Sequence, residues 1–196
     1  SKKDTVLRGQ LLAEPQGFVS AAVHAPTSGT VKDVGSILSP AGTAVESVTI
    51  ASDGKDTPDD SLEPITNWQT TDAETLKQRV RETGIVGMGG AAFPTSVKLS
   101  PPPAKPVDTL LINGAECEPF LTADHRLMLE APQRVVNGCL IIARILGVKT
   151  IIFGIEDNKP DAAAAIRETA DGTPISVYEI PVQYPQGAEK QLIYSA

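Results

Sequence analysis

The segment with the clearest chemical potential is rich in glycine and runs from residue 84 to residue 99. Four glycines lie within seven residues, and an aromatic side chain and a lysine follow them: Gly84, Gly87, Gly89, Gly90, Phe93 and Lys98. Glycine tolerates positive φ and leaves main-chain N–H groups accessible to a ligand, because no Cβ stands in the way. Where such a loop leads into a helix, these N–H groups favour phosphate. The pattern therefore predicts a ligand-binding loop.

A second candidate segment, residues 113–119, directly follows an apolar run and reads Asn-Gly-Ala-Glu-Cys-Glu-Pro. Its two carboxylates, Glu116 and Glu118, are suited to hold ribose or ribityl hydroxyls, or an amide such as nicotinamide. We expect Cys117 to be a small residue beside the ligand rather than a redox thiol, since nothing in the sequence lowers its pKa. The segment predicts a binding turn at the end of a strand.

Two further polar segments also follow predicted strands. Residues 156–160 read Glu-Asp-Asn-Lys-Pro, and two interpretations remain open: they cap a helix with Asn158 as the N-cap, or they close the binding pocket. Residues 184–190 place Gly187 and Glu189 at a strand-to-helix turn. By itself this last signal is weak.

The sequence indicates neither a metal site nor a residue needed as a catalytic acid or base. Cys117 and Cys139 form no C-x-x-C pair, and His24 and His125 are far apart in the chain. We expect His125 to lie at a helix entry or on the surface. The cysteine usage is typical of a reducing compartment.

The elements that would position these residues fall into two predicted domains, residues 1–64 and residues 71–196. The first contains short β-type runs separated by turn residues: Val6–Leu7, Gly17–Val23, Thr30–Val34 and Ser47–Ile50. Residues 24–31 resemble a turn of biotinyl and lipoyl modules. Because Lys32 is not at a tight hairpin tip, we expect a barrel-sandwich β module without a prosthetic group.

The second domain alternates strands and helices. Apolar runs predict strands near residues 109–112, 150–154 and 175–180, and an apolar stripe predicts a helix over residues 132–146. This alternation indicates an α/β fold with a parallel, Rossmann-like sheet and helices on both faces. Ligands bind beyond the carboxyl ends of such strands, where the polar segments described above lie.

The overall composition excludes several classes of function. The chain has 196 residues, 41% hydrophobic residues and a formal charge of −7, so a nucleic-acid partner is not expected. No apolar run is long enough to cross a membrane, and the first residues lack the apolar core of a signal peptide.

Taken together, these motifs resemble those of RnfC, one of the subunits of the Rnf electron-transport complex. The matching segments are collinear and cover almost the whole chain: residues 6–10, 24–31, 84–99, 113–128, 154–160 and 184–192. That family is similar to the FMN- and NADH-binding subunit of respiratory complex I.

The resemblance implies part of an ion-translocating NADH:ferredoxin oxidoreductase. In that family a non-covalent FMN accepts hydride from NADH, and electrons pass to 4Fe-4S clusters that lie outside this chain. The implied partners are the other subunits of a membrane-bound complex, on whose cytoplasmic face the protein is peripheral and does not span the membrane. Two alternatives remain: a non-catalytic docking or structural domain of the complex, and a related flavin-dependent cobalamin reductase.

The resemblance also implies roles for single residues. The flavin would lie against the loop, Lys98 would meet its phosphate or ring edge, and Phe93 would stack on NADH. Carboxylate and amide side chains would hydrogen-bond flavin and dinucleotide, and the turn after the last strand would line the nicotinamide side. The implied cofactor-binding residues are Gly87, Gly89, Gly90, Ala91, Phe93, Lys98, Asn113, Glu116, Glu118, Gly187 and Glu189.

The chain departs from the family pattern at Ala92, where glycine is usual, and differs from the complex I relatives at Ala115, where they have aspartate. The family continues beyond the segment that ends at Ala196. The resemblance therefore implies a flavin domain truncated at its C-terminus, and we expect the chain by itself to be inactive as an oxidoreductase.

Overall fold

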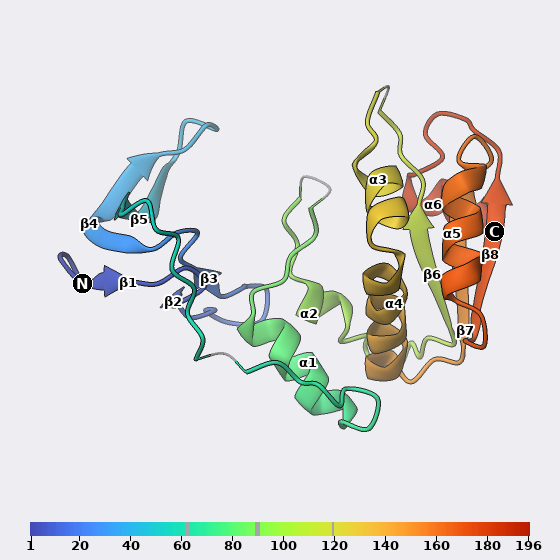
Figure 1. The fold of residues 1–196 in the computed structure, drawn as a ribbon, viewed down its shortest axis with the longest axis horizontal. Coiled ribbons are helices and arrows are strands. Elements are labelled where there is room, and N and C mark those ends of the chain that lie inside the picture. Colours follow the sequence, from blue (N-terminus) through green and yellow to red (C-terminus); the bar gives the residue numbers. More distant parts are fainter. Residues whose placement is uncertain (62, 89–90, 119) are drawn as a thin grey trace. The chain divides into compact units, whose positions relative to one another are not determined.

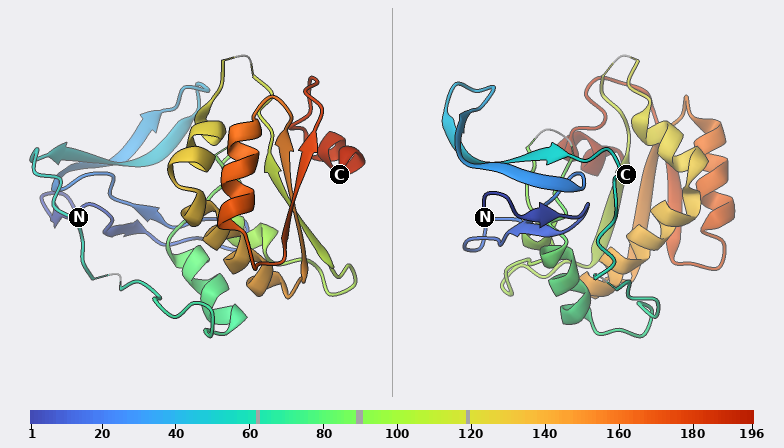
Figure 2. Two further views of the ribbon diagram at one scale, coloured as in Figure 1. Left: turned by 45° about the vertical axis from the view of Figure 1, so that its right-hand side comes forward. Right: turned by 60° about the vertical axis from the view of Figure 1, so that its left-hand side comes forward.

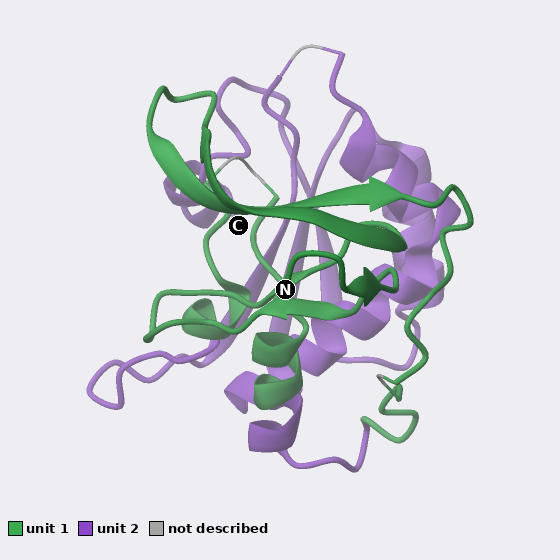
Figure 3. Ribbon diagram, turned by 90° about the vertical axis from the view of Figure 1, so that its left-hand side faces the viewer, with its two compact units in different colours: residues 1–68, 77–98 green, residues 69–76, 99–196 purple. Residues whose placement is uncertain are grey.

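The computed structural model describes residues 1–61, 63–88, 91–118 and 120–196, which form two compact units. Unit 1 comprises the described parts of residues 1–68 and 77–98, and unit 2 comprises those of residues 69–76 and 99–196 (Figure 3). The glycine-rich segment thus belongs to unit 1, whereas the turns after the parallel strands belong to unit 2. The domain boundaries expected from the sequence, 1–64 and 71–196, stay a prediction.

Unit 1 is built mainly from short antiparallel strands. One sheet has the order β1-β4-β5, and a smaller one pairs β2 with β3; their bounds are β1 (Thr5–Val6), β2 (Leu11–Ala13), β3 (Val23–His24), β4 (Gly29–Leu38) and β5 (Ala44–Ser52). The buried core of this unit is small and centres on Val6, Ala25 and Val31. These strands confirm the small β module that the sequence predicts.

The prediction of one strand was wrong. Residues 17–23 are a strand only at Val23, while β2 lies where no strand was expected. Gly17 adopts a φ of 74°, and the Gln16 N–H donates to Ser20 Oγ at 3.0 Å. These local turn contacts replace a sheet ladder in a segment whose apolar composition alone suggested a strand.

Helix α1 (Ala73–Glu82) has clear start and stop signals. The Asp72 carboxylate accepts the Thr75 N–H at 2.9 Å and the Thr75 hydroxyl at 2.6 Å, which satisfies a free donor at the helix start. Gly84 follows the helix with a φ of 67°, and a Cβ there would lie 2.2 Å from the Ala22 carbonyl oxygen. Only glycine fits this position, which leads into the glycine-rich segment.

Unit 2 contains a parallel sheet with the order β6-β7-β8 (Figure 1). Its strands are β6 (Thr109–Gly114), β7 (Thr150–Glu156) and β8 (Ile175–Ile180). Asn113 pairs with Gly154 and Glu156 pairs with Ile180, so the three strands end at the same edge. All three strands were predicted, and the polar turns that follow them are brought to this edge.

Helices cover both faces of this sheet, as predicted. Three lie on one face (Figures 1 and 2): α3 (Ala123–Glu130), α4 (Pro132–Leu146) and α5 (Pro160–Thr169). Ile151, Phe153 and Ile155 of β7 are buried against them. The short helix α6 (Glu189–Ser195) covers the other face, where a Cβ on Gly154 would lie 2.8 Å from Leu192 Cδ1.

In the part of the chain that the structure describes, no helix has the length and apolar character needed to cross a membrane.

Candidate functional site

The glycine-rich segment of unit 1 folds back on itself. The Gly87 N–H donates to the Phe93 carbonyl at 2.9 Å, and the Thr95 N–H donates to the Ile85 carbonyl at 2.9 Å. A short helix, α2 (Thr95–Lys98), follows directly. These pairings bring the start and the end of the segment together, so that residues between them form its tip.

Lys98 lies beside the backbone of this loop. A Cβ built on Gly87 would be 3.2 Å from Lys98 Nζ, which places the ammonium next to the glycine. Phe93 is 38% exposed, and Ala91 is exposed as well. The predicted residues Gly89 and Gly90 lie outside the described residues. The structure therefore groups Gly87, Ala91, Phe93 and Lys98 on one loop.

Ala92 is strained at the tip of the same loop. Its φ is 47°, in the left-handed region where a Cβ crowds the backbone and which glycine adopts freely. This is the position at which the family pattern has glycine. The backbone conformation that glycine would provide is thus kept with alanine in its place.

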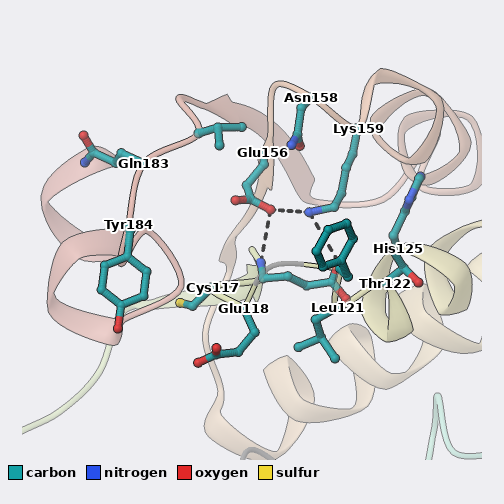
Figure 4. A pocket seen from close by; sticks show the side chains of 13 residues that line it. Cys117, Glu118, Leu121, Thr122, His125, Glu156, Asn158, Lys159, Gln183 and Tyr184 are labelled. Atoms are coloured by element: carbon teal, nitrogen blue, oxygen red, sulfur yellow. Dashed lines mark hydrogen bonds and ion pairs between the residues drawn. The ribbon is translucent and has the colours of Figure 1, made fainter.

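Unit 2 has a cavity of about 400 Å³ at the carboxyl edge of its sheet (Figure 4). The turns after β6, β7 and β8 and the start of α3 surround it. The lining residues are Glu116, Cys117, Glu118, Phe120, Leu121, Thr122, His125, Glu156, Asn158, Lys159, Val182, Gln183 and Tyr184. Acidic and aromatic side chains dominate, so the cavity suits a ligand with hydroxyl or amide donors and a flat ring.

A buried ionic triad forms one wall of this cavity. The Lys159 ammonium lies 3.3 Å from Glu116 Oε2 and also donates to Glu156 Oε2 (Figure 4). The side chains of Lys159, Glu116 and Glu156 are 9%, 2% and 4% exposed. The triad therefore carries two carboxylates and one ammonium almost without water.

Backbone donors complete the triad. The Glu116 N–H donates to Glu156 Oε2 at 3.1 Å, and the Asp124 N–H donates to Glu116 Oε1 at 2.8 Å. Both oxygens of Glu116 are thus engaged, one by Lys159 and one by the first turn of α3. The triad connects the turn after β6, the end of β7 and the starts of two helices.

Two pKa shifts reflect this arrangement. Burial alone would lower the pKa of Lys159, but its hydrogen bonds and charge contacts with Glu156 and Glu116 outweigh burial, and the pKa lies above its ordinary value. Burial, and then the negative charge of Glu116, raise the pKa of Asp124. The first shift keeps Lys159 charged at neutral pH.

A second polar contact lies at the rim of the cavity. His125 Nε2 is 2.9 Å from Asp161 Oδ1, which joins α3 to the first turn of α5. This hydrogen bond is the largest cause of the lowered pKa of Asp161. The position of His125 at the start of α3 agrees with the helix-entry role expected from the sequence.

The turn after β8 is fixed to the turn after β6. The Asn113 Nδ2 donates to the Gly187 carbonyl at 2.7 Å, and Asn113 Oδ1 accepts the Ala115 N–H at 3.1 Å. A Cβ on Gly187 would lie 2.7 Å from Cys117 Sγ and 2.8 Å from the Ala115 carbonyl oxygen. Glycine is therefore needed here for close packing of the two turns.

The structure brings some predicted residues together and gives others different surroundings. Glu116 and Glu118 line the cavity, Asn113 and Gly187 connect two of its turns, and Glu189 is exposed in the first turn of α6. Glu116 is buried within the triad, whereas Glu118 is exposed.

The segment 156–160 contributes to the cavity in a way that the sequence left open. Asn158 was wrongly predicted as the N-cap of α5, because the helix begins at Pro160 and Lys159 is the capping residue. Lys159 and Glu156 were not singled out as functional residues. An acidic residue at the end of a strand and a lysine three residues later, just before the first helical proline, is the signal that could have found them.

Within the described residues, no group of three or more histidine, cysteine, aspartate or glutamate side chains is arranged to hold a metal ion.

The fold and the cavity define a ligand-binding α/β domain that follows a small β module. Comparison with known proteins identifies its class: residues 80–196 match the family described as the Nuo51 FMN-binding domain, and residues 1–55 match the RnfC barrel sandwich hybrid domain. The chain belongs to the RnfC family of Rnf-complex subunits, which confirms the resemblance inferred from its motifs.

Curated relatives are highly similar over nearly the whole chain. The RnfC-type component of the proton-translocating ferredoxin:NAD(+) oxidoreductase complex of Clostridium ljungdahlii is 48% identical over 192 residues, which cover 98% of this chain and 42% of that protein. The corresponding component of the Na(+)-translocating complex of Acetobacterium woodii is 48% identical over 193 residues, covering 98% and 44%. The chain thus spans less than half the length of these relatives.

A solved structure of an NAD+-reducing NiFe hydrogenase in the H2-reduced state also resembles the chain. Its TM-score is 0.54 at 25% sequence identity, and the match covers 67% of this chain and 27% of that chain. The likeness supports the α/β fold with its preceding β module.

Proposed function

We propose that this chain is the FMN- and NADH-binding part of the RnfC component of an ion-translocating ferredoxin:NAD+ oxidoreductase complex. The observation that carries the proposal is the match of residues 80–196 to the Nuo51 FMN-binding domain. The relatives named above, which are subunits of such complexes, support it. When bound, FMN would supply the exchange between two-electron hydride transfer and one-electron transfer.

The chemistry of the available donors fits this cofactor. The Lys98 ammonium beside the backbone of Gly87 suits a phosphate, which is anionic and accepts hydrogen bonds. In the cavity of unit 2, the exposed carboxylate of Glu118 suits a ribityl or ribose hydroxyl, which donates hydrogen bonds. Phe120 and Tyr184 offer aromatic faces in the same cavity.

In this proposal the protein acts by binding and orientation. Lys98 and the loop backbone neutralise the phosphate, and Phe93 stacks on the dinucleotide. Glu118 and Glu116 accept hydrogen bonds from ligand hydroxyls or the carboxamide. Precise placement of two reactants accounts for a large part of catalysis when the chemistry belongs to the cofactor.

The partners follow from the same proposal. Electrons would leave toward 4Fe-4S clusters outside this chain, and the other subunits of the complex would place the domain at the cytoplasmic face of the membrane as a peripheral component. NADH is the proposed electron donor to the flavin.

FMN titration into the chain, followed by flavin fluorescence, tests the proposal. We expect saturable binding that Lys98→Met weakens about tenfold or more, because a charge-assisted contact to phosphate is lost. Lys55→Met, which removes another exposed lysine of unit 1, serves as the matched control and should bind as the parent does. Absence of FMN binding in the parent chain would refute the proposal.

A second measurement tests the electron donor. Anaerobic addition of NADH to the FMN-loaded chain should bleach the flavin absorption band. Persistent absorption would exclude NADH as the donor while FMN binding stands.

A non-catalytic structural role is the second candidate, and a specific observation favours it. Both oxygens of Glu116 and both polar atoms of Asn113 are already engaged within the protein. A docking domain would keep these contacts for packing alone. The FMN titration separates the two candidates, since a docking domain would bind no flavin.

A further inference from the structure

Lys159 stands between two carboxylates that come from different turns. Glu116 belongs to the turn after β6, and Glu156 is the last residue of β7, while Lys159 itself precedes α5. The ammonium contacts both carboxylates and is 9% exposed. A lysine in such surroundings is strongly held, because its charge has little water and two anionic partners.

Glu116 is the member of the triad that reaches furthest into the fold. Its Oε1 accepts the N–H of Asp124 at 2.8 Å, and its own N–H donates to Glu156 Oε2 at 3.1 Å. Two other charged or titratable side chains that line the same cavity are Glu118 and His125. The contact with Lys159 is the one through which a cation balances the charge of Glu116.

From this geometry we infer that Lys159 is a positioning residue: it holds the Glu116 carboxylate against the start of α3 and so fixes the turn that carries the acidic ligand-binding side chains. The importance of this role for ligand binding rests on the proposed function. Lys159 itself acts through Glu116 and needs no contact with the ligand.

Three steps connect Lys159 to the ligand. The ammonium fixes Glu116 Oε2, which orients the carboxylate so that Oε1 meets the Asp124 N–H. The carboxylate then fixes the backbone of its own turn, which Glu156 also holds through the Glu116 N–H. Glu118 lies two residues further along the same turn and lines the cavity. Loss of Lys159 should therefore displace both carboxylates that face the cavity.

The test uses a double variant that keeps the charge of the triad constant. The parent triad has two carboxylates and one ammonium, a net charge of −1; Lys159→Met with Glu156→Gln leaves the Glu116 carboxylate alone, again −1. The glutamine Oε1 can still accept the Glu116 N–H. Lys159→Arg is the conservative rescue, and Lys149→Met is the matched control at the exposed, opposite end of β7.

Amide hydrogen exchange on the flavin-free chain gives the direct readout. We expect the Asp124 amide of the double variant to exchange about tenfold faster or more, while amides of β8 keep their protection. Lys159→Arg should restore the slow exchange, and Lys149→Met should match the parent. Unchanged exchange at Asp124 in the double variant would overturn the inference.

Titration with FMN, and with NAD+, gives the ligand readout. The double variant should bind about tenfold more weakly, and Lys159→Arg should recover most of the affinity. Faster exchange at Asp124 with unchanged affinity for both ligands would overturn the role of Lys159 in binding. If the parent chain binds neither ligand, the proposed function fails, and the exchange measurement alone decides whether Lys159 positions Glu116.

Discussion

Replacement of Lys159 by methionine should destabilise unit 2 strongly. Methionine keeps most of the side-chain volume but removes the charge, and it leaves two carboxylates that are 2% and 4% exposed without their cation. Removal of one partner from a buried ionic contact typically costs about 3–5 kcal/mol. That is a large share of the roughly 5–15 kcal/mol that stabilise a typical domain.

The chain offers separate optical reporters for its two units. Trp68, its single tryptophan, belongs to unit 1, whereas its tyrosines, Tyr178, Tyr184 and Tyr194, belong to unit 2. Urea unfolding followed by tyrosine fluorescence and helical circular dichroism should shift to lower urea, while the tryptophan transition should move little. Lys149→Met should leave both transitions in place.

The pH dependence of the loss provides an internal check. Without Lys159, burial and mutual repulsion raise the pKa of one of the two carboxyls above its unfolded value. A carboxyl with a raised pKa in the folded state gains stability as the pH falls. The variant should therefore be less destabilised at pH 5 than at pH 8. A loss below about 1 kcal/mol at pH 7 would refute the buried triad, since exposed pairs contribute no more than this.

Three further substitutions test other features. Gly187→Ala should destabilise unit 2 by about 1–3 kcal/mol in urea unfolding, because its Cβ would lie 2.7 Å from Cys117 Sγ; an unchanged midpoint would show that the turns are not closely packed. Asp124→Asn should raise stability at neutral pH, because burial and Glu116 raise the pKa of Asp124 and its ionised form opposes folding; thermal melts should show a gain that shrinks as the pH falls toward 4, and a loss at pH 7 would contradict this sign. Ala92→Gly should raise the stability of unit 1 by about 0.5–1 kcal/mol in tryptophan-detected unfolding, because relief of left-handed strain exceeds the entropy cost of glycine, whereas a decrease would argue against the positive φ.

The fold of unit 2 could be predicted from the sequence because its signals are periodic and local. The apolar stripe of residues 132–146, with a proline at the start and Gly147 at the end, corresponds to α4 as observed. The strand over residues 175–180 was placed with its observed bounds. In unit 1 the strands are short and partly exposed, so that local turn contacts at Gln16 and Ser20 overrode the apolar composition.

The candidate site was predictable in its position but not in its contacts. Residues after parallel strands meet at one edge of the sheet, and this rule placed Glu116 and Glu118 at a cavity. Whether a carboxylate faces a ligand or a buried lysine depends on neighbours distant in sequence, such as Lys159, which is 43 residues from Glu116. No local pattern specifies that partner.

The triad also restricts the order in which substitutions can accumulate at its three positions. A single neutral replacement at residue 116, 156 or 159 alters the balance of two buried carboxylates and one ammonium. Replacement of a whole buried ionic cluster by well-packed apolar residues, in contrast, is often tolerated. Among descendants of a common ancestor, these positions should therefore be inherited together or exchanged together, so the identity of one of them should predict the other two.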